Sequence, residues 1–120
     1  QAHGLINTDK DNLSDPYARV VILPDKKKKS KRKTRVIKDT LQPMWEETFE
    51  YDVASLSDAR TKTLDVVVKN DKSLFSREKT FMGECLISLE AMFDLEFGNV
   101  DWYKLQDHGV FESIIKKIQD

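Results

Sequence analysis

The stretch between residues 15 and 49 most constrains how this chain can fold. Residues 17–23 are rich in Val and Ile, as in a β-strand, and they end at Pro24-Asp25. A second strand-like segment then returns with most of the positive charge of the stretch. Proline fixes φ and donates no backbone hydrogen bond, so Pro16, Pro24 and Pro43 fit strand starts and turns. We therefore expect two strands joined by a turn at Pro24-Asp25.

Several later segments show the same pattern of short apolar or alternating runs between turn signals. The predicted strands are residues 17–23, 31–37, 45–53, 64–69, 81–89 and 102–105. Such a series favours an all-β domain folded as an antiparallel β-sandwich. The side chains expected to be mostly buried between its sheets are Val20, Ile22, Trp45, Phe49, Val66, Val68 and Leu86.

Two short helical segments are also predicted. Residues 90–94 have the pattern of a helical turn. Beyond Gly109, apolar residues recur at helical spacing, which predicts a C-terminal amphipathic helix. These residues are Phe111, Ile114, Ile115 and Ile118.

Composition limits the classes of protein to which the chain can belong. Its 120 residues suit one domain, and 34% of them are charged, as on a heavily charged soluble module. Cys85 is the only cysteine, so no internal disulfide can form, which fits a cytoplasmic setting. The chain has no secretory signal pattern and no apolar run long enough to span a bilayer. Any membrane contact is therefore expected to be peripheral.

Positive charge is concentrated in one run, although the formal net charge of the chain is only −1. Residues 26–35 contain eight basic side chains and no acidic one. Such a run indicates an anionic partner, either lipid headgroups, another phosphate or an acidic protein, while a merely solvated loop is the alternative. Nucleic acid is disfavoured, because no aromatic residues are interleaved for base stacking. The candidate binding residues are Lys26, Lys27, Lys28, Lys29, Lys31, Arg32, Lys33 and Arg35.

Five motifs, in this order, carry a resemblance to a known family. They are Ser14-Asp15-Pro16-Tyr17, Leu23-Pro24-Asp25, Lys33-Thr34, the segment from Thr40 to Phe49, and Phe81-Met82-Gly83-Glu84. Together they resemble the C2 domain, in the form found in synaptotagmin, rabphilin and RIM proteins, over about residues 2–105. The resemblance implies an eight-stranded Greek-key sandwich whose loops at one end meet membranes, often through calcium. We therefore expect a C2-like domain at residues 1–109 and a helix or tail at residues 110–120.

The resemblance also implies where calcium would bind. Asp9 and Asp15 stand where the family has its first-loop ligands, but Asn70 and Lys72 stand where it has third-loop aspartates. Calcium requires several oxygen ligands, and lysine offers none. We therefore expect weak or absent calcium binding, with Asp9, Asp15 and Asp71 as the metal ligands if a site exists. The alternative role for Asp9 and Asp15 is to cap loops through Asx turns.

The family's first strand normally precedes a segment such as residues 2–5, where this chain starts. Either the chain is truncated or something else occupies that sheet edge. The predicted helix at residues 111–118 is one candidate cover, a swapped or permuted strand is another, and a homodimer through the open edge is a third.

The residues thus favour a non-enzymatic module that targets membranes in a trafficking, exocytosis or signalling protein. It would bind anionic phospholipid, in particular phosphoinositide, through Lys31, Arg32, Lys33 and Arg35, with Lys26–Lys29 adding long-range attraction. One alternative is a calcium-independent module that docks an acidic protein. Another is calcium-triggered membrane insertion of Leu74 and Phe75. Catalysis is disfavoured because Cys85 falls within a predicted strand and no nucleophile–base pair is evident.

Overall fold

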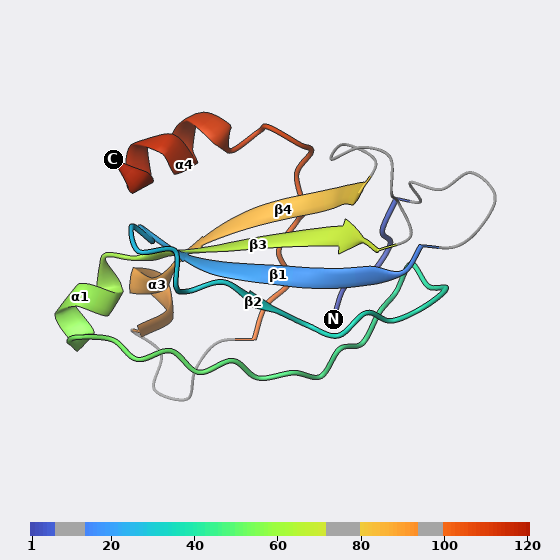
Figure 1. Ribbon diagram of the computed structural model, residues 1–120, viewed down its shortest axis with the longest axis horizontal. Coiled ribbons are helices and arrows are strands. Elements are labelled where there is room, and N and C mark those ends of the chain that lie inside the picture. Colours follow the sequence, from blue (N-terminus) through green and yellow to red (C-terminus); the bar gives the residue numbers. More distant parts are fainter. Residues whose placement is uncertain (7–13, 72–79, 94–99) are drawn as a thin grey trace.

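A four-stranded antiparallel sheet forms the centre of the molecule in the computed structural model, which describes residues 1–6, 14–71, 80–93 and 100–120 (Figure 1). The strand order is β2-β1-β3-β4. The strands are β1 (Pro16–Leu23), β2 (Arg32–Lys33), β3 (Thr63–Asn70) and β4 (Phe81–Ser88). The helices among the described residues are α1 (Leu56–Arg60), α3 (Leu89–Phe93) and α4 (Glu112–Gln119).

The register of the strands gives the sheet two different faces. β1 pairs with β3 along its whole length, and β3 pairs with β4. Successive strand residues point to opposite sides. The core face therefore carries Ala18, Val66, Val68 and Cys85, whereas the helix face carries a row formed by Arg19, Val67 and Glu84.

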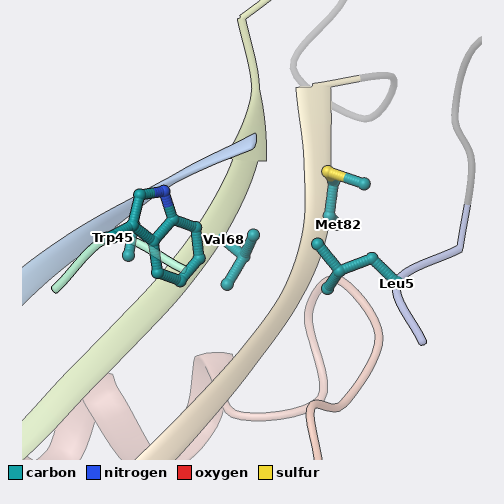
Figure 2. Close-up of a cluster of buried hydrophobic side chains, with 5 residues drawn as sticks. Leu5, Trp45, Val68 and Met82 are labelled. Atoms are coloured by element: carbon teal, nitrogen blue, oxygen red, sulfur yellow. The ribbon is translucent and has the colours of Figure 1, made fainter. Parts of the chain in front are cut away.

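The hydrophobic core lies on the core face and is centred on Trp45. Figure 2 shows the indole of Trp45 beside Val68, with Met82 and Leu5 farther along the same cluster. Trp45 is 5% exposed, and its Nε1 donates a hydrogen bond to the carbonyl of Pro16 at 3.2 Å. This one side chain therefore joins the segment after β2 to the first strand of the sheet.

The layer over the core face is formed by three segments that are not regular strands. They are the N-terminal residues 1–6, the segment after β2 that contains Leu41, Pro43 and Trp45, and residues 100–110. The amides of Ala2 and Leu5 donate to the carbonyls of Pro43 and Leu41, at 3.0 and 3.1 Å. Residues 100–110 pass behind the sheet in Figure 1, and in this segment Gln106 exchanges two backbone hydrogen bonds with Glu84. None of these segments has enough backbone partners to continue a ladder. The antiparallel fold class is confirmed, whereas regular strands at 45–53 and 102–105 are not found.

The predictions for individual elements had different outcomes. The strands predicted at 17–23, 64–69 and 81–89 are present with small shifts, but only Arg32–Lys33 of the segment 31–37 is regular. Helices are present at both predicted places, as α3 and α4. Helix α1 was not predicted, although Ser55 caps it by accepting a hydrogen bond from the Asp58 amide at 3.0 Å. None of the described helices is long and apolar enough to cross a membrane.

The predicted core was only partly correct. Trp45 and Val68 are buried. The prediction was wrong in degree for the other five residues, which are only half-buried: Val20, Ile22, Phe49, Val66 and Leu86. Val20, Ile22 and Val66 point to the core face, which is covered by irregular segments rather than by a complete second sheet, so that face is not fully enclosed. For example, Val66 lines a hollow of about 200 Å³ between residues 1–3 and 101–105. Leu86 pairs with Asp65 and points to the helix face instead.

The two tryptophans offer a test of this packing. We expect Trp45→Phe to lower the free energy of unfolding by about 1–3 kcal/mol, because it leaves a void and removes the bond to the Pro16 carbonyl. Trp102 is 67% exposed, so Trp102→Phe should change stability by less than about 0.5 kcal/mol. Urea unfolding of both variants measures the difference. Equal losses of stability would contradict the central role of Trp45.

Candidate functional site

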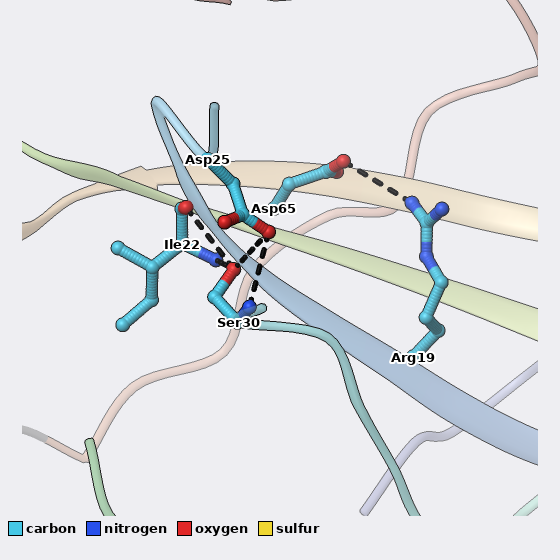
Figure 3. A network of polar contacts seen from close by, with 5 residues as sticks. All are labelled: Arg19, Ile22, Asp25, Ser30 and Asp65. Carbon is cyan, nitrogen blue, oxygen red and sulfur yellow. Dashed lines mark hydrogen bonds and ion pairs between the residues drawn. The ribbon is translucent and has the colours of Figure 1, made fainter. Parts of the chain in front are cut away.

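The turn after β1 is closed by one carboxylate and one hydroxyl group. The Asp25 carboxylate accepts a hydrogen bond from the Lys29 amide at 3.1 Å. It also accepts from the Ser30 amide at 3.1 Å and from the Ser30 Oγ at 2.7 Å (Figure 3). The Ser30 Oγ also accepts from the amide of Ile22 at 3.0 Å. Partial burial acts to raise the pKa of Asp25, but these hydrogen bonds hold it below its usual value. We call this arrangement the Asp25–Ser30 latch.

The latch presents a tip of four exposed lysines, residues 26–29. One backbone hydrogen bond closes this turn: the Lys28 amide donates to the Asp25 carbonyl at 3.2 Å. The Lys26 Nζ reaches the Asp120 carbonyl after α4 at 3.2 Å. The Asp25 amide donates to the side chain of Gln119 at 2.6 Å, so the tip also contacts the C-terminal helix.

After the tip, the two basic side chains of β2, Arg32 and Lys33, point to opposite faces of the sheet. Lys31, Lys33 and Arg35 are exposed, whereas Arg32 is half-buried. Lys33 pairs with Arg19 and therefore lies on the helix face, where its Nζ is 5.8 Å from the ring centre of Tyr17. These three exposed cations form what we call the open basic patch.

Arg32 points the other way, because it pairs with Val20 of the core face. Its guanidinium lies 4.7 Å from the ring centre of Tyr51, a cation–π contact, and donates to the Lys29 carbonyl at 3.2 Å. Arg32 and Tyr51 line a hollow of about 690 Å³. Its charged lining is mixed, with Lys26, Lys27, Lys29 and Lys62 beside Asp25, Asp52 and Asp58. The structure thus separates Arg32 from Lys33, which points to the other side of β2.

At the other end of the sheet, Asp15 helps to hold the backbone. The Asp15 carboxylate accepts from the Asp39 amide at 2.8 Å, and the Asp15 amide donates to the Asn70 side chain at 2.9 Å. Asp15 is buried and Asp71 is exposed. Within the described parts of the chain, no group of three or more His, Cys, Asp or Glu residues is placed to hold a metal ion.

Asp9, the third predicted ligand, lies outside the described residues, as do Lys72 and the predicted membrane-contacting residues Leu74 and Phe75. The calcium and insertion hypotheses therefore stay predictions.

A buried cluster of charged groups on the helix face was not identified from the sequence. Arg19 contacts the Asp65 carboxylate at 3.2 Å, and the buried Glu84 lies in the same row as Arg19. Burial, together with the neighbouring Asp65, raises the pKa of Glu84 from 4.5 to about 8. Glu84 and Arg19 border a hollow of about 410 Å³ that also touches Ile115 of α4. The sequence of β4 gives no sign that Glu84 will be buried, because the helix beside it, α4, comes much later in the chain.

Cys85 and His108 have packing roles in this structure. Burial raises the pKa of the Cys85 thiol to about 11, so it is protonated at neutral pH and is a poor nucleophile. The His108 ring meets the edge of the Phe81 ring at a centroid distance of 5.0 Å. Neither residue forms part of a nucleophile–base pair among the described residues.

A comparison with known protein families matches residues 1–105 to the C2 domain. Human extended synaptotagmin-2 is 42% identical over 96 residues, which are 80% of this chain and 10% of that protein. Human regulating synaptic membrane exocytosis protein 2 is 38% identical over 97 residues, or 80% of this chain and 7% of that protein. The chain therefore spans only a small part of these relatives.

Solved structures show the same similarity. The RIM C2A domain from Drosophila has a TM-score of 0.73 and 33% identity, covering 87% of this chain and 79% of that one. The RIM2 C2A domain has a TM-score of 0.70 and 32% identity, covering 87% and 78%.

The raised pKa of Glu84 makes a prediction about stability and pH. The folded state keeps a proton on Glu84 that the unfolded state releases, so stability should fall as pH rises from about 4.5 to about 8. Glu84→Gln cannot ionise and should remove this loss, by at most about 1.4 kcal/mol per pH unit for one proton. Unfolding by urea across this pH range measures the effect. Exposed Glu50→Gln is the control, and parallel profiles for wild type and Glu84→Gln would contradict the prediction.

Proposed function

Since this chain belongs to the C2 domain family, we propose that it is a peripheral membrane-targeting module that binds anionic phospholipid, in particular phosphoinositide. C2 domains are non-catalytic modules, and one similar protein is named for regulating synaptic membrane exocytosis. We infer a corresponding place for this chain in a trafficking, exocytosis or signalling protein, at the cytoplasmic side of a membrane.

The observation that carries this proposal is the open basic patch. Lys31, Lys33 and Arg35 are each exposed, Lys33 pairs with Arg19 of β1, and Tyr17 lies next to the Lys33 ammonium. An arginine can hold a phosphate through two parallel hydrogen bonds, while lysines act as point charges. Three such cations suit a headgroup that carries several phosphates better than a lipid with a single negative charge.

The lysine tip has a different part in the proposal. Residues 26–29 are exposed at the end of a turn, and their flexible side chains do not fix the position of a particular headgroup. Each basic residue near such a surface contributes about 1 kcal/mol, and the attraction falls off within a Debye length. The tip should therefore strengthen binding to any anionic membrane without selecting a headgroup.

Weak or absent calcium dependence is part of the proposal. The Asn70 side chain already accepts the Asp15 amide, and one Asp15 carboxylate oxygen accepts the Asp39 amide. Both residues thus have a structural role that needs no metal. Calcium-triggered insertion through Leu74 and Phe75 is the competing hypothesis.

A second candidate function is calcium-independent binding of an acidic protein. The hollow beside Arg32 and Tyr51 favours it, because this hollow lies on the opposite side of β2 from the open basic patch. An acidic peptide seated there would meet Arg32, Lys62 and the tip lysines, and it would also lie near Asp52 and Asp58. Such an adaptor should ignore vesicles of any composition.

Vesicle binding by two sets of variants tests the proposal. Lys31→Ala/Lys33→Ala/Arg35→Ala should lose selectivity for phosphatidylinositol bisphosphate, with a roughly ten- to hundredfold weaker affinity. Alanine at all four tip positions, 26–29, should instead weaken binding to every anionic vesicle, and both effects should shrink at high salt. Co-sedimentation at two salt concentrations, with and without the phosphoinositide and calcium, measures these effects.

The chain offers a charge-matched control. Lys38, Lys104 and Lys117 are exposed cations outside the basic run, so their triple alanine variant removes the same charge elsewhere. It should keep the phosphoinositide selectivity. If the open-patch variant bound as wild type does, the phosphoinositide proposal would be wrong and the protein-partner hypothesis would gain support.

A further inference from the structure

We propose that Ser30 is a phosphorylation site for a protein kinase that selects basic sequences, and that phosphate at this position opens the Asp25–Ser30 latch. The modification would also reduce the attraction of the lysine tip to anionic surfaces. This last consequence rests on the proposed function, whereas the site and the opening of the turn do not.

The surroundings of Ser30 suit recognition by such a kinase. Ser30 is the only hydroxyl residue in the segment 26–33, and all seven other residues there are Lys or Arg. The four lysines before it and Lys31 after it are exposed. An enzyme with an acidic substrate groove would therefore be attracted to this segment by complementary charge.

In the unmodified chain the Ser30 hydroxyl closes the turn. It donates to the Asp25 carboxylate at 2.7 Å and accepts from the Ile22 amide at 3.0 Å (Figure 3). The Asp25 carboxylate also accepts the amides of Lys29 and Ser30. Because the turn is an exposed hairpin tip, these bonds can open locally without disturbing the core, which gives a kinase access to the hydroxyl.

Phosphorylation removes the proton on which the latch depends. The γ-phosphoryl group of ATP is transferred to the Ser30 Oγ, the O–H bond breaks, its proton leaves, and ADP is released. The modified oxygen can no longer donate to Asp25. A group carrying about −1.5 to −2 charge then lies against a carboxylate, so the two repel and the turn cannot close again in the same way.

The added charge also lies in the middle of the basic run. It offsets about two of the eight positive charges between residues 26 and 35. For a membrane-bound module this predicts roughly tenfold or greater weakening of binding to anionic vesicles. A loosened turn would spread the remaining lysines and add to the loss.

The first experiment tests the site in the full chain. The protein is incubated with Mg·ATP and a kinase of basic-sequence preference, and the modified residue is located by tandem mass spectrometry. We expect incorporation at Ser30, none in Ser30→Ala, and restored incorporation in Ser30→Thr. Ser57, exposed in α1 without a basic run, is an internal control. Modification only at other residues, such as Thr34, would overturn the proposal.

The second experiment tests the latch. Hydrogen exchange of the Lys29 and Ser30 amides should speed up on phosphorylation, because both amides lose the Asp25 carboxylate. In Asp25→Asn the side-chain amide can donate to the phosphate, so phosphorylation should change exchange much less. Unchanged exchange in the phosphorylated wild type would overturn the opening of the turn.

Vesicle co-sedimentation of the same samples then tests the functional consequence. Phosphorylated wild type should bind vesicles containing phosphatidylserine and phosphatidylinositol bisphosphate at least severalfold more weakly than unmodified protein. Equal binding would overturn this consequence. If even the unmodified chain fails to bind, the proposed membrane function is wrong, while the first two experiments still decide the modification site.

Discussion

The insertion of Trp45 against β1 is the contact on which the two-layered fold depends. The sheet has its own ladder of backbone hydrogen bonds, but the extended segments over its core face have few. Burial of the indole and its bond to the Pro16 carbonyl fix one of these segments on the sheet. Leu5 and Leu105 then pack around the same cluster. The packing of Trp45 thus compensates for the backbone hydrogen bonds that these segments lack.

Two polar contacts hold the ends of this sheet, and both use loop aspartates. Asp15 connects the start of β1 to Asn70 at the end of β3, and Asp25 connects the end of β1 to Ser30. In the C2 resemblance, loop aspartates suggested calcium ligands. One carboxylate oxygen of Asp15 accepts the Asp39 amide, so this aspartate has a structural role whether or not a metal binds.

The sequence was most informative where a segment's own pattern decides its structure. The valine-rich strands and the Ile114–Ile118 helical spacing predicted β1, β3, β4 and α4 well. Alternation at 45–53 predicted an extended chain, but it did not reveal that the segment lacks partners for a ladder. The cluster of Arg19, Asp65 and Glu84 was missed for a related reason, since its burial depends on a helix that is distant in sequence. Long-range partners, rather than local conformation, were the missing information.

The alternation along β2 limits how many of the basic side chains one flat surface can meet. Lys33 lies on one side of the strand with Arg19, and Arg32 lies on the other with Tyr51. A planar bilayer touching the first side cannot also touch the second. Fewer basic side chains of residues 26–35 can therefore contact a membrane at once than their formal charge of eight suggests. Arg32 is then left for a curved surface or for a second ligand. Strand β2 therefore presents basic side chains on two opposite sides instead of forming one flat binding surface.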